Sequence, residues 1–211
     1  MDTSNLVFMR MPLGPLGTNC YVIGDKKVGE AVIIDPASTE VLEALKKYDL
    51  KPKAVLLTHG HGDHIGGVQG IVDAYDIPIY IQHDDVKYLS DPELNLSNYS
   101  NPTPIIVKGR IEEVREGDHI TCGSVDLTVY ETPGHTPGGV CYYIPGLVFV
   151  GDTLFNQSIG RTDFVEGDYD TLIDAIKTKL YTLPDETMVY PGHGPETQIG
   201  YEKQYNPFVG A

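Results

Sequence analysis

Three histidines and an aspartate lie within six positions of one another, in the run from His59 to His64. The apolar stretch Ala54–Leu57 directly precedes them and predicts a buried central strand of an α/β sheet. Residues two apart in an extended segment point the same way, so His59 and His61 can direct both imidazoles at one point, while Asp63 and His64 can face a second point nearby. Imidazole and carboxylate groups are the usual ligands of zinc, iron and manganese. The run therefore predicts a metal site rather than a solvated loop.

Three further turns carry the same kinds of side chain, and each follows a predicted strand. They contain His135, Asp152 and His193, each surrounded by glycine and proline or glycine and threonine. Such residues fix a backbone without covering the side chain that it presents. One of these turns alone would be weak evidence, but together with the first loop they predict a single metal-binding constellation. His83 and His119 have no ligand-spaced neighbour, so we expect structural roles for them.

The elements that position these loops follow from hydrophobic patterns. Further strands are predicted at Val7–Met11, Cys20–Ile23, Ala31–Ile34, Ile79–Gln82, Ile105–Val107, Val125–Glu131, Val140–Ile144, Leu147–Val150 and Thr187–Tyr190. Helices are predicted after Ser38, with Val41, Leu45 and Tyr48 on one face, after His64, and after Asp168. Strands followed by a helix occur in both halves of the chain, which predicts two packed sheets with helices outside.

Length and composition narrow the class of protein. A chain of 211 residues without a linker fits one domain spanning residues 1–211. The net charge of −15 argues against a nucleic-acid partner, and no apolar run is long enough to cross a membrane. The stretch Met1–Asn5 lacks the basic and apolar regions of a signal peptide. Cys20, Cys122 and Cys141 are widely spaced, which favours reduced core residues. We therefore expect a cytoplasmic protein.

The loops, taken in order, resemble the five motifs of the metallo-β-lactamase superfamily over nearly the whole chain. The first motif corresponds to Asp35, and the others to the loops already described. The resemblance implies an α/β fold, a four-layer αβ/βα sandwich of two mixed sheets with helices outside. It also implies two divalent metal ions, zinc in the first place with iron or manganese as alternatives. Metal 1 would be held by His59, His61 and His135, metal 2 by Asp63, His64 and His193, and Asp152 would bridge them.

Within the superfamily, the chain is similar to the short bacterial form of the glyoxalase II-like (hydroxyacylglutathione hydrolase-like) group. The stretches Gly151–Phe155, Gly160–Asp163 and Pro191–Thr197 carry this similarity. Aspartate rather than cysteine at position 152 departs from the true β-lactamases of the fold, and the acidic charge and short length argue against the tRNA-processing nucleases. Few residues follow His193, whereas long glyoxalases II add a helical segment that grips the glutathione carboxylate. We therefore expect weak recognition of glutathione.

The implied reaction is hydrolysis of a small 2-hydroxyacyl thioester such as S-lactoylglutathione. Two ions roughly 3.5–4 Å apart would hold a bridging water and lower its pKa towards 7, and the hydroxide would attack the thioester carbonyl. Asp63 and Asp152 are the catalytic carboxylates of this scheme. Arg161 could meet an anionic substrate group or form a structural salt bridge. Asp35 could orient a metal-bound histidine or simply end its strand.

Two other functions are compatible with these residues. A persulfide dioxygenase of the same superfamily would hold a single iron with His59, His135 and Asp152, and its family also carries a Gly-Arg-Thr-Asp stretch. A non-catalytic metal-binding or interaction module is the other, and the intact set of seven ligand candidates argues against it. The expected partner is a small-molecule thioester, with neither nucleic acid nor membrane. The oligomeric state cannot be read from the sequence.

Overall fold

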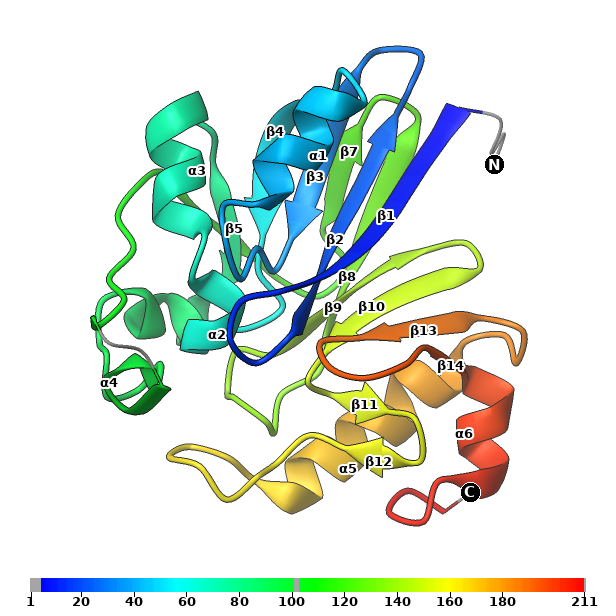
Figure 1. Ribbon diagram of the computed structural model, residues 1–211. Coiled ribbons are helices and arrows are strands. Elements are labelled where there is room, and N and C mark those ends of the chain that lie inside the picture. The colour runs from blue at the N-terminus through cyan, green and yellow to red at the C-terminus, as the bar shows by residue number, and fades with distance from the viewer. Residues whose placement is uncertain (1–4, 101–102, 211) are drawn as a thin grey trace.

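Two mixed sheets with helices on their outer faces form the frame of the chain (Figure 1). The computed structural model describes residues 5–100 and 103–210. Residues 1–4, which make up most of the stretch that argued against a signal peptide, lie outside the described residues. Among the described residues, no helix has the length and apolar character needed to cross a bilayer.

The first sheet contains six strands in the same order in space as in the sequence. They are β1 (Leu6–Leu13), β2 (Thr18–Asp25), β3 (Glu30–Ile34), β4 (Lys51–Leu56), β5 (Ile79–Gln82) and β6 (Ile111–Val114). The pairs from β1 to β3 are antiparallel and those from β3 to β6 are parallel. The associated helices are α1 (Val41–Lys47), α2 (Gly62–Ile65), α3 (Val68–Tyr75), the 3₁₀ helix η2 (His83–Leu89) and α4 (Ser97–Ser100).

The second sheet also contains six strands, and only its pair β10–β13 is parallel. In spatial order they are β14 (Thr197–Gln198), β13 (Met188–Pro191), β10 (Leu147–Gly151), β9 (Val140–Ile144), β8 (Val125–Glu131) and β7 (His119–Cys122). A ribbon of β11 (Leu154–Phe155) and β12 (Ser158–Ile159) follows β10. The remaining helices are α5 (Tyr169–Thr178), the 3₁₀ helix η3 (Leu180–Thr182) and α6 (Ile199–Tyr205).

Side-chain alternation along the strands creates the layers. In β2, Val22 packs into the core beneath α1 and α3, whereas Tyr21 and Ile23 face the second sheet. In β10, Val148 packs into the core beneath α5 and α6, whereas Phe149 faces the first sheet. Three cores therefore separate four layers, helix, sheet, sheet and helix, and the predicted αβ/βα sandwich is confirmed.

The strands that precede the ligand-bearing loops all end at one edge of the sandwich. Strands β3 and β4 are parallel, as are β10 and β13, and β8 runs in the same direction as β10 because two antiparallel steps separate them. Loops that are distant in the sequence therefore meet at the carboxyl ends of their strands, where α/β sheets place their sites.

Some predicted elements differ from the observed ones. Ile105–Val107 is not a strand, because its backbone groups bond to Asn95, Ser97 and Leu89 rather than to a sheet, and β6 takes the edge position instead. Ser38 accepts a hydrogen bond from the backbone of Glu40, but α1 begins only at Val41, so Ser38 is not its cap. Tyr48, predicted on the apolar face, lies just beyond the end of α1 and is 55% exposed.

The three cysteines are buried and unpaired, as predicted, and each lies in a different core. His83 and His119 also behave as expected, since each forms a surface ion pair, with Glu113 and Asp126 respectively. His119 opens strand β7.

Candidate metal centre

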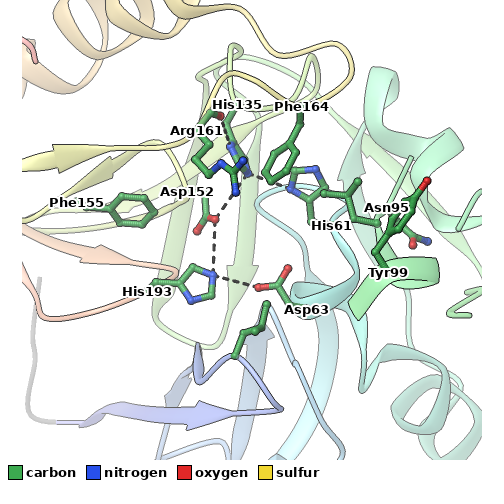
Figure 2. A pocket seen from close by; sticks show the side chains of 12 residues that line it. His61, Asp63, Asn95, Tyr99, His135, Asp152, Phe155, Arg161, Phe164 and His193 are labelled. Carbon is green, nitrogen blue, oxygen red and sulfur yellow. Dashed lines mark hydrogen bonds and ion pairs between the residues drawn. The ribbon is translucent and has the colours of Figure 1, made fainter. Parts of the chain in front are cut away.

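Seven histidine and aspartate side chains converge at the edge where the two sheets meet. Figure 2 shows five of them, His61, Asp63, His135, Asp152 and His193. They form three overlapping groups, each with ligand atoms within 4.8 Å of one another: His59, His61 and His135; His59, His64 and Asp152; and Asp63, His64 and His193. Every one of the metal-ligand candidates from the sequence belongs to at least one group. The first and third groups contain the same residues as the two expected ligand sets, and the second lies between them.

The first loop leaves strand β4 and enters α2, so its ligands come from both an extended segment and a helical turn. His61 is the N-cap of α2 and is still extended, with φ −67° and ψ 148°. Asp63 and His64 lie inside the helix, where the backbone turns and directs them to the group that also contains His193. The change from an extended segment to a helix therefore directs His59 and His61 to one group and Asp63 and His64 to another, as the spacing predicted.

A buried carboxylate fixes the orientation of two of the histidines. Asp35 accepts hydrogen bonds from the Thr58 backbone N–H at 2.8 Å and from the Thr58 hydroxyl at 2.6 Å. Because that hydroxyl donates to Asp35, it accepts from Nδ1 of His59, which lies 3.1 Å away. Asp35 Oδ2 also lies 3.0 Å from Nδ1 of His64. The hypothesis that Asp35 orients a histidine is therefore confirmed, directly for His64 and through Thr58 for His59.

The ring of His135, in a loop of the second sheet, is also oriented by a hydrogen bond at Nδ1. Its Nδ1 lies 2.7 Å from the backbone carbonyl of Arg161, which can only accept, so Nδ1 carries the proton. In His59 and His135 the lone pair is consequently at Nε2, the atom that faces the cluster. Nε2 of His64 also faces the cluster, and although burial opposes it, the surrounding carboxylates of Asp63, Asp152 and Asp35 raise the pKa of His64. Metal-binding histidines typically donate their other ring N–H to a carboxylate or carbonyl in this manner.

The donor set fits a metal centre on observations of this structure. Nε2 of His59, Nε2 of His64 and Oδ1 of Asp152 are buried without a hydrogen-bond partner. Buried polar atoms rarely remain unpaired, and three such atoms side by side form a place that a shared cation would satisfy. A Cβ at Gly192 would lie 2.3 Å from Asp152 Oδ1 and 2.6 Å from His64 Cε1, so only glycine lets this loop approach the cluster.

The electrostatics of the cluster also favour cation binding. Burial lowers the pKa of His61 to about 3, and burial together with the neighbouring histidines lowers that of His59. Both imidazoles are therefore neutral at physiological pH, as a metal ligand must be. Burial would raise the pKa of Asp63 and Asp152, but the nearby histidines outweigh it and lower both, so the carboxylates stay ionised.

Asp152 lies between the two groups that contain the expected ligand sets. Its Oδ1 is 3.4 Å from Nε2 of His64, and its Oδ2 is 3.6 Å from Nε2 of both His135 and His193. Figure 2 shows the carboxylate between the rings of His135 and His193. His193 also faces Asp63, whose Oδ2 lies 3.0 Å from Nε2 of His193. A carboxylate with both oxygens directed at different groups is suited to serve two cations.

A second buried carboxylate, Asp85, ties the loops of the three-histidine group together. It accepts hydrogen bonds from the N–H of Gly60 at 2.9 Å, the hydroxyl of Thr136 at 2.8 Å and the N–H of Gly138 at 2.7 Å. Gly60 lies between His59 and His61, and Thr136 follows His135. One carboxylate on η2 thus joins a loop of the first sheet to a loop of the second.

The His193 loop is held by strands β1 and β2. Asn19 donates from Nδ2 to the carbonyls of Pro191 at 2.9 Å and Gly194 at 3.0 Å, and Arg10 donates to the same Gly194 carbonyl. The neighbouring Thr18 donates to Asp63 Oδ2 at 2.9 Å. The start of β2 therefore positions residues of the Asp63, His64 and His193 group, as Asp85 does for the three-histidine group.

Five residues of the cluster, all but His59 and His64, line a cavity of about 630 Å³. Arg161 lines this cavity, as predicted for a substrate contact, and also forms an ion pair with Asp163, as the competing interpretation predicted. Asp85, Asn19 and Thr58 were not identified from the sequence. A buried asparagine in a strand is unusual and could have been noticed, whereas Asp85 follows another aspartate and carries no distinguishing signal.

The sequence profile of the metallo-beta-lactamase superfamily matches residues 13–193, and the chain belongs to this superfamily. The superfamily binds divalent metals. Among curated relatives, a probable metallo-hydrolase of Bacillus subtilis is 39% identical over 206 residues, which cover 95% of this chain and 96% of that protein. A hydroxyacylglutathione hydrolase of Haemophilus influenzae is 35% identical over 205 residues, covering 94% and 96% of the two chains. The chain is thus similar to hydrolases along its length.

Solved structures agree with this assignment. The B3 metallo-beta-lactamase BLEG-1 has a TM-score of 0.90 and 42% identity, covering 97% of this chain and all 100% of that one. TTHA1623 in a di-iron-bound form has a TM-score of 0.85 and 35% identity, with coverages of 95% and 100%. ETHE1 from Myxococcus xanthus has a TM-score of 0.79 and 32% identity, with coverages of 96% and 84%.

Proposed function

We propose that the chain is a binuclear metal-dependent hydrolase that cleaves small 2-hydroxyacyl thioesters, of which S-lactoylglutathione is the reference compound. The observation that carries this proposal is the cluster of seven ligand candidates, five of which line one cavity, with the Nε2 atoms of His59, His64 and His135 all directed into the cluster. A single catalytic ion held by the other histidines would not require the intact group of Asp63, His64 and His193. The similarity to a hydroxyacylglutathione hydrolase supports the thioester.

The residues around the cavity would divide the work of hydrolysis. His59, His61 and His135 would hold one ion, Asp63, His64 and His193 the other, and Asp152 would contact both. Zinc is our first expectation, with iron or manganese as alternatives, because nitrogen and oxygen ligands discriminate weakly among these metals. When bound, the two ions would supply activation of water and polarisation of the thioester carbonyl.

The chain's own groups then orient the reactants. The Asp63 carboxylate lines the cavity and stays ionised, so it can accept a hydrogen bond from the attacking water and direct its lone pair at the carbonyl carbon. Asp152 maintains negative charge between the two groups. No serine or cysteine is among the described residues that line the cavity, which leaves water as the nucleophile. The three buried thiols favour a reducing compartment, so the cytoplasm remains our expectation.

A persulfide dioxygenase is the second candidate, because ETHE1 from Myxococcus xanthus has the same fold at 32% identity. It would use a single iron held by His59, His135 and Asp152. One experiment separates the two candidates. Purified protein is loaded with zinc, manganese or iron(II) and then given either a lactoyl thioester or glutathione persulfide. Release of thiol and uptake of oxygen are both measured. Release of thiol from the lactoyl thioester, with no oxygen uptake on either substrate, supports the hydrolase. Oxygen uptake with glutathione persulfide, without release of thiol from the lactoyl thioester, would move the assignment to the dioxygenase.

Two additions sharpen this experiment. A β-lactam is included as a third substrate because BLEG-1 is described as a metallo-beta-lactamase. Asp152→Asn tests the site, with Asp185→Asn as its matched control, since Asp185 is an exposed aspartate in an ion pair with Lys203 away from the cavity. Thiol release that persists in Asp152→Asn would contradict the proposed site even if the wild-type protein is active.

A further inference from the structure

The cavity walls beside the cluster are apolar and aromatic. Their side chains are Leu16, Leu96, Tyr99, Phe155 and Phe164, and they come from the β1–β2 turn, the segment around α4, strand β11 and the loop after β12. Leu16 is 59% exposed and Tyr99 is 76% exposed. Exposed apolar side chains grouped beside a reactive centre indicate a surface that a ligand covers.

Outside the cluster, the described residues that line the cavity include three polar side chains, and each is already engaged within the chain. The Asn95 amide is bonded to three backbone groups of its own neighbourhood. The Tyr99 hydroxyl donates to Glu93 at 2.6 Å. The Arg161 guanidinium is paired with Asp163. Asp163 therefore offsets the charge of Arg161, the one arginine or lysine among the described residues that line the cavity.

The Arg161–Asp163 pair has the geometry of a fixed unit. Nε and Nη2 of Arg161 each lie 2.9 Å from a different oxygen of Asp163, which is the bidentate arrangement. The guanidinium carbon lies 4.2 Å from the ring centroid of Phe164, and that ring in turn packs 5.6 Å from the imidazole of His61. Arg161, the cation that the sequence offered for substrate binding, is thus paired with an exposed carboxylate.

We propose that the site takes thioesters whose thiol part is uncharged and apolar, and that Asp163 disfavours carriers that bear carboxylates, such as glutathione. This inference rests on the proposed thioester hydrolysis and specifies its substrate class. An apolar thiol part gains free energy by covering Leu16, Tyr99 and Phe155. A carboxylate would meet the negative charge of Asp163, which offsets the attraction that Arg161 would otherwise exert.

The test compares three lactoyl thioesters that differ only in the thiol, using the metal-loaded protein. The thiols are glutathione, the small neutral N-acetylcysteamine and the neutral aromatic benzyl mercaptan. We expect kcat/KM for the benzyl thioester to exceed that for the N-acetylcysteamine thioester about tenfold, as burial of part of one aromatic group allows. Phe155→Ala should remove most of this advantage. The glutathione thioester should be no better than that of N-acetylcysteamine.

The role of the ion pair has its own variant and control. Asp163→Asn frees Arg161 and should raise kcat/KM for the glutathione thioester about two- to fivefold, the usual worth of an exposed charge pair. The neutral thioesters should not change. Asp185→Asn is the matched control, because Asp185 is 72% exposed and Asp163 is 68% exposed, and each is paired with a cation. This control should leave all three values unchanged.

A binding measurement separates failure of this inference from failure of the proposed function. Calorimetry with the corresponding thioethers, which cannot be hydrolysed, should rank benzyl above N-acetylcysteamine and glutathione, and Asp163→Asn should tighten only the glutathione compound. If no thioester is hydrolysed, the proposed function fails, while the order of thioether binding still decides the inference. The inference would be overturned if the wild-type protein preferred the glutathione compounds and Asp163→Asn did not alter that preference.

Discussion

Replacing Asp85 by asparagine should destabilise the folded chain by about 2–4 kcal/mol and weaken metal binding at the three-histidine group. The carboxylate accepts from Gly60, Thr136 and Gly138 at 2.9, 2.8 and 2.7 Å. An asparagine side chain of the same shape has only one oxygen. Whichever way the amide turns, at least one of these donors will face an NH₂ group that cannot accept.

The expected loss of stability in Asp85→Asn follows from the burial of the Asp85 side chain. A buried donor without an acceptor costs about 1–3 kcal/mol, and the remaining bonds each lose roughly 1 kcal/mol when the acceptor is no longer charged. Part of this loss is recovered, because burial raises the pKa of Asp85 and the asparagine removes a poorly solvated charge. The net effect is smaller than the roughly 5–15 kcal/mol that stabilise a typical domain, so the variant should still fold.

Urea denaturation of the metal-free protein measures the stability, and calorimetric titration with zinc measures binding. Asp84→Asn is the matched control, since Asp84 is the exposed neighbour of Asp85 on the same 3₁₀ helix, and it should change stability by less than about 0.5 kcal/mol. If Asp85→Asn matches Asp84→Asn in both stability and zinc affinity, the claim that Asp85 joins the two loops is wrong.

Three other variants or conditions test further parts of the structure. Asn19→Ala removes the hydrogen bonds to the carbonyls of Pro191 and Gly194, and should weaken the second zinc-binding step in a titration while leaving the first unchanged. Asp152→Asn should lower thioester turnover about 100-fold or more with little change in the urea midpoint, because it removes charge but keeps shape. Burial raises the pKa of Cys141 from 9.0 to about 12, so its thiol should resist alkylation in the folded protein. Because the pKa of Cys141 is higher in the folded than in the unfolded chain, its contribution to the free energy of unfolding is fully present below about pH 9 and is lost as the pH rises towards 12. Urea midpoints measured at increasing pH test this loss.

The layers and the ligand loops were predictable because both depend on local patterns. Apolar runs such as Ala54–Leu57 mark buried strands, and the turns that carry His135 and His193 are marked by glycine and proline. The contacts of Asp85 and Asn19 were not predictable, because each joins loops from different sheets, and no spacing in the sequence reports which backbone groups will meet. Ile105–Val107 shows the opposite error, since an apolar run there satisfies its backbone groups with loop partners instead of a sheet.

Arg161 shows a further limit of sequence reasoning. Its position after Gly160 indicated a cation near the cleft, and it does line the cavity. Whether its charge is available depends on the conformation that brings Asp163, two residues further on, into bidentate contact. Residue type therefore located the group, but only the structure shows that the charge is paired.

The central claim, that the cavity holds a pair of metal ions, is tested most directly by elemental analysis of the purified protein after loading with zinc and removal of free metal. We predict two ions per chain, falling to one in Asp63→Ala and His193→Ala because these changes affect only the group of Asp63, His64 and His193. A ratio of one ion per chain in the wild-type protein, unchanged in both variants, would contradict the binuclear centre and leave a mononuclear site at the other histidines.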